Sequence, residues 1–357
     1  MNIAVIQRFL PSVSRGGVGY FTHGLCNALV HRGHSVTVFS QDSAPEDALY
    51  QVHCVPKSSC VWKDPLLFPF QVRRLDLSGF DIVHAQGDDQ WIGPRSSLRV
   101  VRTLHGSAWK EAIYNGLACH SLKRFLMHSY FYLMELIAVL RADTVIAVSE
   151  DTRHYYPKFD GVIPNGVDAK AYTSVGTGKS THPSILFVGE MNSRKRGALL
   201  LNVFREKIFS EIPGAELWLV SPEKVEEKNV VWFGKVDSLK LIELYQQAWV
   251  FCLPSSYEGF GRPYIEAMAA GTPVISSPNP GAREVLKNNE YGIIAADTEL
   301  PQALIRMLKD DSLRQAYIEK GRERAQLFSW DKVALQYEDV YNGLLNKKNK
   351  RNKNVPV

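Results

Sequence analysis

The chain has 357 residues, 45% of them hydrophobic and 22% charged, which fits a soluble globular protein large enough for two domains with substantial cores. Its formal net charge of +5 has one source, because five basic residues near the C-terminus equal the whole excess of basic over acidic residues. The rest of the chain is formally neutral, and this excludes an enzyme with a broad basic face for nucleic acids. Those five residues are Lys347, Lys348, Lys350, Arg351 and Lys353.

The five cysteines are scattered and include no C-x-x-C pair, so they indicate neither a disulfide framework nor a zinc site. Cysteines without such a framework favour a reducing compartment. The N-terminus lacks the basic region and long apolar core of a signal peptide. We therefore expect a cytoplasmic protein.

The first forty residues predict a strand, a helix and a second strand. Residues 3–6 form a short apolar run, residues 19–32 carry apolar side chains at helical spacing, and residues 34–40 again have the pattern of a strand. The loop before the helix contains Gly16 and Gly17. A βαβ unit of this kind is compatible with a dinucleotide site.

The dinucleotide fingerprint G-x-G-x-x-G is incomplete in this loop. Gly17-Val18-Gly19 supplies two glycines, but Thr22 stands at the third position, and the glycines lie well beyond the strand. The fingerprint requires them directly after it. Asp42, which follows the second strand, is the one residue that favours a nicotinamide site. A nicotinamide oxidoreductase is therefore the most remote function that we retain.

Two further strands are predicted at residues 80–85 and 100–106, and the second ends in His105-Gly106. A histidine at the carboxyl edge of a parallel sheet either packs in the core or faces a ligand. Asp88-Asp89 in the intervening loop is not a D-x-D motif. We therefore expect no metal site and no cofactor.

Residues 122–140 are the most apolar stretch, yet they contain charged residues and fall short of the roughly 20 apolar residues that a membrane span needs. A core helix is the default interpretation. The alternative is a surface helix that touches lipid through Tyr130, Phe131 and Tyr132. The basic tail at 346–357 also has two interpretations, a solvated disordered end or a contact with the anionic inner face of a membrane.

The first domain is predicted to span residues 1–170 and to close after the string I-P-N-G-V-D at 163–168. Residues 171–184 are polar and contain glycine, as a linker does, and a second domain follows at 185–330. Gly178-Lys179-Ser180 in the linker resembles part of a phosphate-binding P-loop. The glycine that such a loop requires five positions earlier is missing and no strand precedes it, so we dismiss this interpretation.

The second domain opens with a predicted strand at 184–188 and a loop that carries three consecutive cations, Arg194, Lys195 and Arg196. Positive charges at the start of a helix oppose its dipole, so a structural role explains them poorly. A bound anion at this point would account for them.

Residues 249–273 predict a buried strand, a glycine-bearing loop and a helix with Pro263 in its first turn. Ligands of parallel sheets bind outside the carboxyl ends of the strands, where this loop lies. Gly259-Phe260-Gly261 lets backbone N–H groups approach an anionic or polyhydroxyl ligand. Glu258 and Glu266 flank these glycines, and carboxylates commonly hold the paired hydroxyls of a sugar.

The string E-G-F-G-R-P-Y-I-E at 258–266 resembles the E-x7-E signature of retaining glycosyltransferases of GT-B fold, specifically glycosyltransferase family 4. The string I-P-N-G-V-D is similar to the interdomain signature of the same family. The resemblance implies an α/β protein with two Rossmann-like domains that face each other across a cleft. It also implies that a terminal helix at about 331–345 packs back on the first domain.

The resemblance assigns roles to individual residues. Glu258 would contact hydroxyls of the donor sugar, Glu266 would hold the nucleotide ribose, and His105 would lie beside the donor sugar. The expected catalytic residues are Glu258, His105 and Arg196. The expected donor-binding residues are Gly16, Gly17, Arg194, Lys195, Arg196, Lys235, Val236, Gly259, Phe260, Gly261 and Glu266.

One loop departs from the family pattern. Members usually show Gly-Arg followed a few residues later by Lys-Gly, whereas here Glu190 replaces the arginine and Arg196 replaces the lysine. Either Arg194 or Lys195 would then supply the missing charge.

The resemblance predicts transfer of a sugar, with retention at the anomeric carbon and without a metal, from a UDP- or GDP-sugar to an acceptor hydroxyl. The acceptor would be a carbohydrate or a lipid-linked molecule, in the synthesis of cell-surface polysaccharide, lipopolysaccharide or glycolipid. One alternative is a nucleotide-sugar epimerase of the same fold. Another, which Glu190 favours, is a non-catalytic nucleotide-sugar binder. No nucleic-acid partner is expected.

Overall fold

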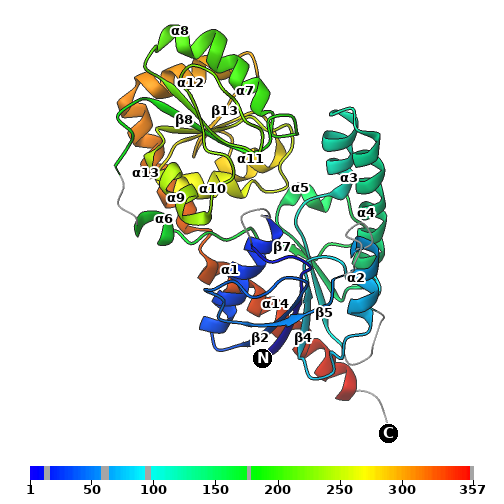
Figure 1. The fold of residues 1–357 in the computed structure, drawn as a ribbon. Helices are drawn as coiled ribbons and strands as arrows, with labels where there is room; N and C mark the ends of the chain where they lie inside the picture. The colour runs from blue at the N-terminus through cyan, green and yellow to red at the C-terminus, as the bar shows by residue number, and fades with distance from the viewer. Residues whose placement is uncertain (12–16, 58–63, 93–97, 175–177, 354–357) are drawn as a thin grey trace. The chain divides into compact units, whose positions relative to one another are not determined.

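The computed structural model describes residues 1–11, 17–57, 64–92, 98–174 and 178–353, and the chain divides into two compact units (Figure 1). The first unit comprises residues 1–109, 127–166 and 330–357, and the second comprises residues 110–126 and 167–329. No helix in the described ranges combines the length and the apolar character needed to cross a bilayer.

The first unit is built on a seven-stranded parallel sheet with the order β3-β2-β1-β4-β5-β6-β7. The interior strand β1 is buried at four consecutive positions, as expected of a parallel sheet with helices on both faces. Ile3 of β1 pairs with Val36 on one side and Ile82 on the other. The strands are β1 (Asn2–Ile6), β2 (Ser35–Ser40), β3 (Gln51–Cys54), β4 (Ile82–Ala85), β5 (Val100–Leu104), β6 (Thr144–Ala147) and β7 (Gly161–Val162).

The helices of the first unit include the last helix of the chain, which lies beside the first one (Figure 1). Gly24 permits this approach, because a Cβ atom at that position would lie 2.2 Å from Cε2 of Trp330. The helices of the unit, with two that cross its boundary, are α1 (Val18–His31), α2 (Asp64–Arg73), α3 (Ala108–Glu111), α4 (Leu122–Arg141), α5 (Glu150–Arg153) and α14 (Trp330–Lys353).

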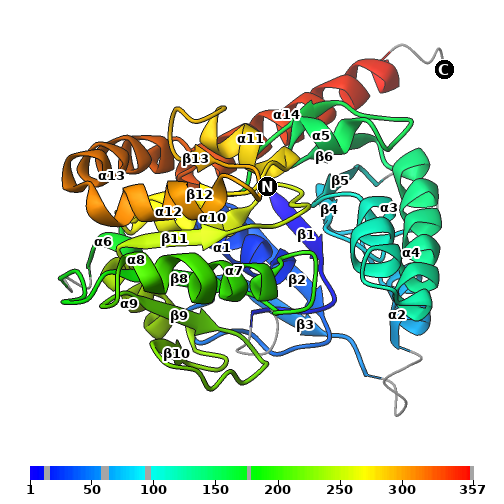
Figure 2. The ribbon, with the colours of Figure 1, turned by 90° about the horizontal axis from the view of Figure 1, so that it is seen from above.

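The second unit contains a six-stranded parallel sheet with the order β10-β9-β8-β11-β12-β13. Figure 2 shows β8 and β11 next to each other, and Ile185 pairs with Val250. The strands are β8 (Ser184–Val188), β9 (Glu216–Val220), β10 (Val230–Trp232), β11 (Val250–Leu253), β12 (Val274–Ser276) and β13 (Ile293–Ile294).

The helices of the second unit surround this sheet, and two of them are single π-helical segments. They are η1 (Ala112–Leu117), α6 (Ala171–Ser174), α7 (Gly197–Val203), η2 (Phe204–Ile208), α8 (Phe209–Glu211), α9 (Ser238–Gln247), α10 (Arg262–Ala269), α11 (Pro280–Leu286), α12 (Leu300–Lys309) and α13 (Asp311–Gln326).

Helix α4 is not a core helix, so the default interpretation of residues 122–140 is wrong. Its buried residues are Ala138 and Val139, whereas Leu122, Leu126 and Leu133 are exposed. A helix with apolar side chains all around its axis cannot bury them all when only one of its faces packs on the protein.

Three segment boundaries differ from those predicted. Helix α14 continues to Lys353, so residues 346–353 are helical rather than a disordered tail. Lysine and arginine are good helix formers, and extending an existing helix costs little compared with starting one.

The other two differences concern the segments between the predicted domains. Residues 110–126 pack with the second unit, and residues 171–184, predicted as a linker, contain the short helix α6.

Candidate functional site

The E-x7-E stretch forms strand β11, a loop and helix α10, which confirms the predicted strand–loop–helix order. Pro263 lies in the first turn of α10, where its missing N–H leaves no helical hydrogen bond unmade. Gly261 has a φ of 88°, and a Cβ atom there would lie 2.3 Å from Cδ2 of Tyr264. Only glycine therefore allows the loop to turn into the helix at this point.

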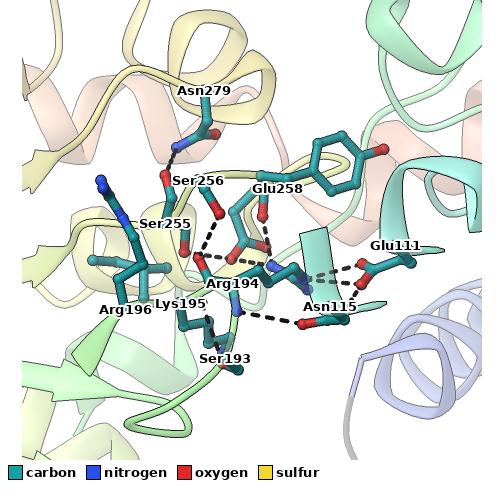
Figure 3. A network of polar contacts seen from close by, with 12 residues as sticks. Glu111, Asn115, Ser193, Arg194, Lys195, Arg196, Ser255, Ser256, Glu258 and Asn279 are labelled. Carbon is teal, nitrogen blue, oxygen red and sulfur yellow. Dashed lines mark hydrogen bonds and ion pairs between the residues drawn. The ribbon is translucent and has the colours of Figure 1, made fainter. Parts of the chain in front are cut away.

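Glu258 is buried in the loop and is held by two donors. Arg194 donates from Nη1 to its Oε1 at 2.6 Å, and Ser255 donates from its hydroxyl to the same oxygen at 2.9 Å. The same loop is hydrogen-bonded to the backbone of residues 194–196. The N–H and the hydroxyl of Ser256 both donate to the carbonyl oxygen of Arg194 (Figure 3). The β8–α7 loop and the β11–α10 loop therefore form one site.

Arg194 bridges two carboxylates. Besides Glu258, it donates from Nε to Glu111, at 3.1 Å from Oε2, and Asn115 accepts from its backbone N–H at 3.3 Å (Figure 3). Although burial opposes the charge, the carboxylates of Glu258 and Glu111 raise the pKa of Arg194 above its ordinary value. The guanidinium is therefore permanently charged and locked in place.

Arg196 is likewise paired with a carboxylate of the protein. Its Nη1 and Nη2 atoms donate to the two oxygens of Asp297 at 2.8 and 2.9 Å, and its Nε donates to the carbonyl oxygen of Pro254 at 2.5 Å. The backbone of Arg196 is left-handed, with a φ of 56°, at the N-cap of α7. Arg194 and Arg196 therefore have carboxylate partners within the protein that are distant in sequence, and their assignment to donor binding stays a prediction.

Lys195 differs from both of its neighbours. Its Nζ donates to the carbonyl oxygen of Val188 at 3.1 Å, and no carboxylate of the described residues forms an ion pair with it. Burial lowers its pKa, with Glu258 opposing that shift and Arg194 adding to it. Glu266 also acts electrostatically on this ammonium group, so both carboxylates of the E-x7-E stretch act on Lys195.

Glu266 lies on the first turns of α10 and is buried. Arg262 forms an ion pair with it at 2.8 Å, and the hydroxyl of Tyr245 donates to its Oε2 at 3.3 Å. Glu258, Glu266 and the half-buried Lys195 thus belong to one charged cluster in the second unit.

The remaining predicted residues of the second unit differ in exposure. Phe260 is 2% exposed and packs edge-on against Phe328, so only its backbone can face a ligand. Gly259 is half-buried beside it. Lys235 is exposed and Val236 half-buried in the loop after β10, and no hydrogen bond or ion pair within the described ranges joins Lys235 to the charged cluster.

The predicted residues of the first unit lie at the carboxyl edge of its sheet. His105 follows β5, its Nε2 lies 2.7 Å from the acceptor oxygen Oε1 of Gln86, and its ring packs edge-on against Phe21. Burial and the nearby Arg102 lower the pKa of His105 to about 3. Gly17 is the N-cap of α1 with a φ of 70°, while Gly16 falls outside the described residues.

Sequence reasoning missed the contribution of residues 111–115. Glu111 and Asn115 contact Arg194, and the ring of Tyr114 stacks on Tyr257, with centroids 5.5 Å apart and an interplanar angle of 4°. These residues precede the predicted second domain, and their sequence carried no signal; in the structure they lie at the start of the π-helix η1, a conformation common near functional sites. Within the described part of the chain, no cluster of three His, Cys, Asp or Glu side chains is arranged to hold a metal ion.

Comparison with known proteins relates this site to a family. A phosphatidyl-myo-inositol mannosyltransferase from Mycolicibacterium smegmatis is 29% identical over 217 residues, which make up 55% of this chain and 56% of that protein. The match thus spans about half the length of that relative.

Solved structures share the fold over nearly the whole chain. Sucrose-phosphate synthase from Thermosynechococcus elongatus has a TM-score of 0.76 at 23% identity, covering 97% of this chain and 99% of that one. HepE from Anabaena, in complex with UDP-glucose, has a TM-score of 0.70 at 16% identity, covering 96% of this chain and 100% of that one. The fold is therefore GT-B, with two Rossmann-like parallel sheets.

Two family profiles match the chain one after the other. The profile described as Glycosyltransferase Family 4 matches residues 15–171, and the profile described as Glycosyl transferases group 1 matches residues 174–324. The second match includes the cation loop and the whole E-x7-E stretch. The chain therefore belongs to the group 1 glycosyltransferases of glycosyltransferase family 4.

Proposed function

We propose that this protein transfers a sugar from a nucleotide diphosphate sugar to an acceptor hydroxyl, with retention of configuration at the anomeric carbon and without a metal ion. The observation that carries the proposal is the environment of Lys195. Lys195 is half-buried, and removing an ammonium group from water is costly unless it is paired; a single carbonyl oxygen at 3.1 Å compensates for this poorly. A diphosphate bound at Nζ would supply the missing negative charge.

The two neighbouring cations support this assignment because their charges are already matched. Arg194 is bound by two carboxylates, and Arg196 forms a bidentate pair with Asp297. Lys195 also crosses the backbone just before Glu190, since its Cδ lies 2.3 Å from where a Cβ of Gly189 would be. Lys195 thus supplies positive charge beside the position where the family usually has arginine.

The proposed reaction breaks the bond between the anomeric carbon and the diphosphate oxygen, and the electron pair leaves with the diphosphate. The acceptor oxygen bonds to the same face of the sugar and gives its proton to the departing phosphate. Lys195 stabilises the charge that develops on the leaving group. Glu258 orients donor hydroxyls, Glu266 holds the ribose, and His105 of the first unit contacts the sugar.

The relatives favour particular donors and acceptors. HepE is described with UDP-glucose, and the mycobacterial relative is named as a mannosyltransferase that acts on phosphatidyl-myo-inositol. We therefore propose a UDP- or GDP-sugar as donor and a carbohydrate or lipid-linked acceptor of polysaccharide, lipopolysaccharide or glycolipid synthesis. The protein would work in the cytoplasm, with the basic end of α14 near the inner face of the membrane.

The test is a transfer assay with UDP-, GDP- and ADP-sugars, each offered with carbohydrate acceptors and phosphatidylinositol vesicles. We expect one donor to yield a glycoside whose anomeric configuration, read by proton NMR, matches that of the donor. A glycoside of inverted configuration would contradict retention. Donor that is isomerised without any acceptor would instead identify an epimerase, and donor binding with no turnover would identify a non-catalytic binder.

A further inference from the structure

A second polar cluster, separate from the charged one, lies within the first unit and ends at His105. Nε2 of His105 is 2.7 Å from Oε1 of Gln86, and the amide nitrogen of Gln86 is 3.1 Å from Nε2 of His84. His84 is fully buried and Gln86 is 6% exposed. The side chain of Gln86 therefore bridges the two histidine rings, with its carbonyl oxygen facing His105 and its amide nitrogen facing His84.

The far side of His84 is bound by residues that are distant in sequence. Its Nε2 is 2.7 Å from the hydroxyl of Thr103, which in turn is 2.9 Å from the hydroxyl of Tyr337. Its Nδ1 is 2.7 Å from the hydroxyl of Tyr341. Both tyrosines belong to α14, so the last helix of the chain completes the cluster.

One arrangement of protons is compatible with every contact of this chain of hydrogen bonds. The amide N–H of Gln86 and the hydroxyl of Thr103 share Nε2 of His84 as acceptor. His84 therefore carries its proton on Nδ1 and donates it to the hydroxyl of Tyr341. The carbonyl oxygen of Gln86 can only accept, so Nε2 of His105 must carry a proton. A second proton on His84 would face the N–H of Gln86 and lose a hydrogen bond in a buried place.

We propose that Gln86 is a positioning residue that fixes His105 as the tautomer protonated at Nε2, and that α14 sets the orientation of Gln86 through Tyr341 and His84. His105 then presents Nδ1 as an acceptor to a ligand. The effect of this tautomer on catalysis rests on the proposed function, because the group that donates a hydrogen bond to Nδ1 would be a hydroxyl of the nucleotide-linked sugar.

The tautomer itself is measured on the ligand-free protein, without any sugar. Ring nitrogens with and without a proton have well-separated ¹⁵N chemical shifts, and the signals of His105 are assigned by their loss in His105→Ala. We expect a protonated Nε2 and an unprotonated Nδ1 in the wild type. A His105 ring protonated at Nδ1 alone would overturn the proposal, whether or not the protein transfers sugars.

Two variants test the link, with one matched control. Gln86→Leu removes the amide, and Tyr341→Phe removes the acceptor for Nδ1–H of His84, so each should shift His105 toward the other tautomer. Tyr50→Phe removes the same hydroxyl from another buried tyrosine–histidine pair of the first unit, in which Tyr50 lies 3.0 Å from Nδ1 of His23. This control should leave the His105 signals unchanged. Unchanged signals in both Gln86→Leu and Tyr341→Phe would overturn the proposal.

The catalytic consequence is measured separately. Gln86→Leu should lower kcat/KM by about tenfold to a hundredfold, as expected for one lost hydrogen bond at a reacting sugar. A variant that changes tautomer but keeps the wild-type kcat/KM would overturn the positioning role. If the wild type turns over no donor at all, the proposed function fails while the tautomer assignment keeps its own test.

Discussion

The two units place their candidate residues at the same edge of a similar parallel sheet, but they hold them by different means. In the second unit, Arg194, Lys195 and Glu258 form a charged cluster in which Lys195 has no ion pair with a carboxylate of the described residues. In the first unit, Gln86 and His105 belong to a neutral chain of hydrogen bonds. The comparison thus shows ion pairs around the candidate residues of one unit and neutral hydrogen bonds around those of the other.

The two clusters should also differ in how they respond to pH. Charges held by opposite charges remain fixed across a wide pH range, whereas neutral histidines must stay unprotonated to keep their hydrogen bonds. Variants of the charged cluster should therefore act mainly on catalysis and donor binding. Variants of the hydrogen-bonded histidine cluster should act on tautomer, stability and pH dependence, and on turnover through His105.

The largest effect is expected from Glu258→Ala. The change removes the carboxylate proposed to hold the donor sugar and leaves Arg194 with Glu111 as its remaining carboxylate partner. We expect kcat/KM to fall by about a thousandfold, the scale of a lost preorganised contact at the reacting centre. The control is Glu206→Ala, an exposed glutamate on η2 that should keep wild-type activity. Turnover of Glu258→Ala within tenfold of the wild type would refute its role.

Two lysines of the second unit, whose ammonium groups donate to backbone carbonyl oxygens, allow a comparison. Lys179 donates to the carbonyl oxygens of Ala248 and Gly271 and to the hydroxyl of Thr272, whereas Lys195 has one carbonyl partner. Lys195→Met should lower kcat/KM by about a hundredfold while leaving the free energy of unfolding equal or higher. Lys179→Met should do the opposite, losing about 1–3 kcal/mol of stability with little effect on turnover. Equal losses of activity in both variants would contradict the assignment.

Acid should destabilise the first unit through its histidines. Burial lowers the pKa of both His84 and His105 to about 3, from an ordinary value of 6.5. Between these values the unfolded chain binds more protons than the folded one, so this stability is fully present above pH 6.5 and is lost as the pH falls toward 3. We expect a loss on the order of 1–2 kcal/mol per histidine between pH 7 and 5, measured by urea unfolding.

Removing one of these histidines should flatten that dependence. His84→Gln should lose less stability between pH 7 and 5 than the wild type does. The exposed His182 provides the control, because His182→Gln should follow the wild-type curve. Parallel curves for His84→Gln and the wild type would contradict the account of a neutral cluster.

The smallest effect is expected from Glu111→Gln, which tests whether the carboxylate of Glu111 weakens donor binding by neutralising Arg194. The change removes one of the two carboxylates bound to Arg194, so more positive charge is available to an anionic donor. We expect the dissociation constant of the donor to fall several-fold, as measured by calorimetry. Weaker donor binding would mean that Glu111 supports the site rather than competing with the donor.

The sequence predicted the parts of this molecule that depend on neighbouring residues. The β11–α10 unit could be recognised because its strand, glycines, Pro263 and both carboxylates lie within one short stretch. The partners of the cations could not be recognised, since Glu111 lies 83 positions from Arg194 and Asp297 lies 101 positions from Arg196. The local sequence therefore does not show which of the three consecutive cations has a carboxylate partner.

The same limit applies to the first unit. His105 was selected from its place at the end of a strand, but Gln86 and Tyr341 carried no local signal. Tyr341 lies 257 positions from His84, and only the packing of α14 on the first unit brings them together. The sequence likewise did not reveal that α4 is exposed, because an apolar composition does not show which side chains pack against the rest of the protein.

The most direct test of the central claim is a calorimetric titration of the proposed donor into wild type and Lys195→Met. The account predicts that one UDP- or GDP-sugar binds the wild type, that the corresponding nucleoside without phosphates does not, and that Lys195→Met binds the donor at least tenfold more weakly, about 1.4 kcal/mol. Equal affinity of wild type and Lys195→Met for the donor would contradict the claim that this lysine holds the diphosphate.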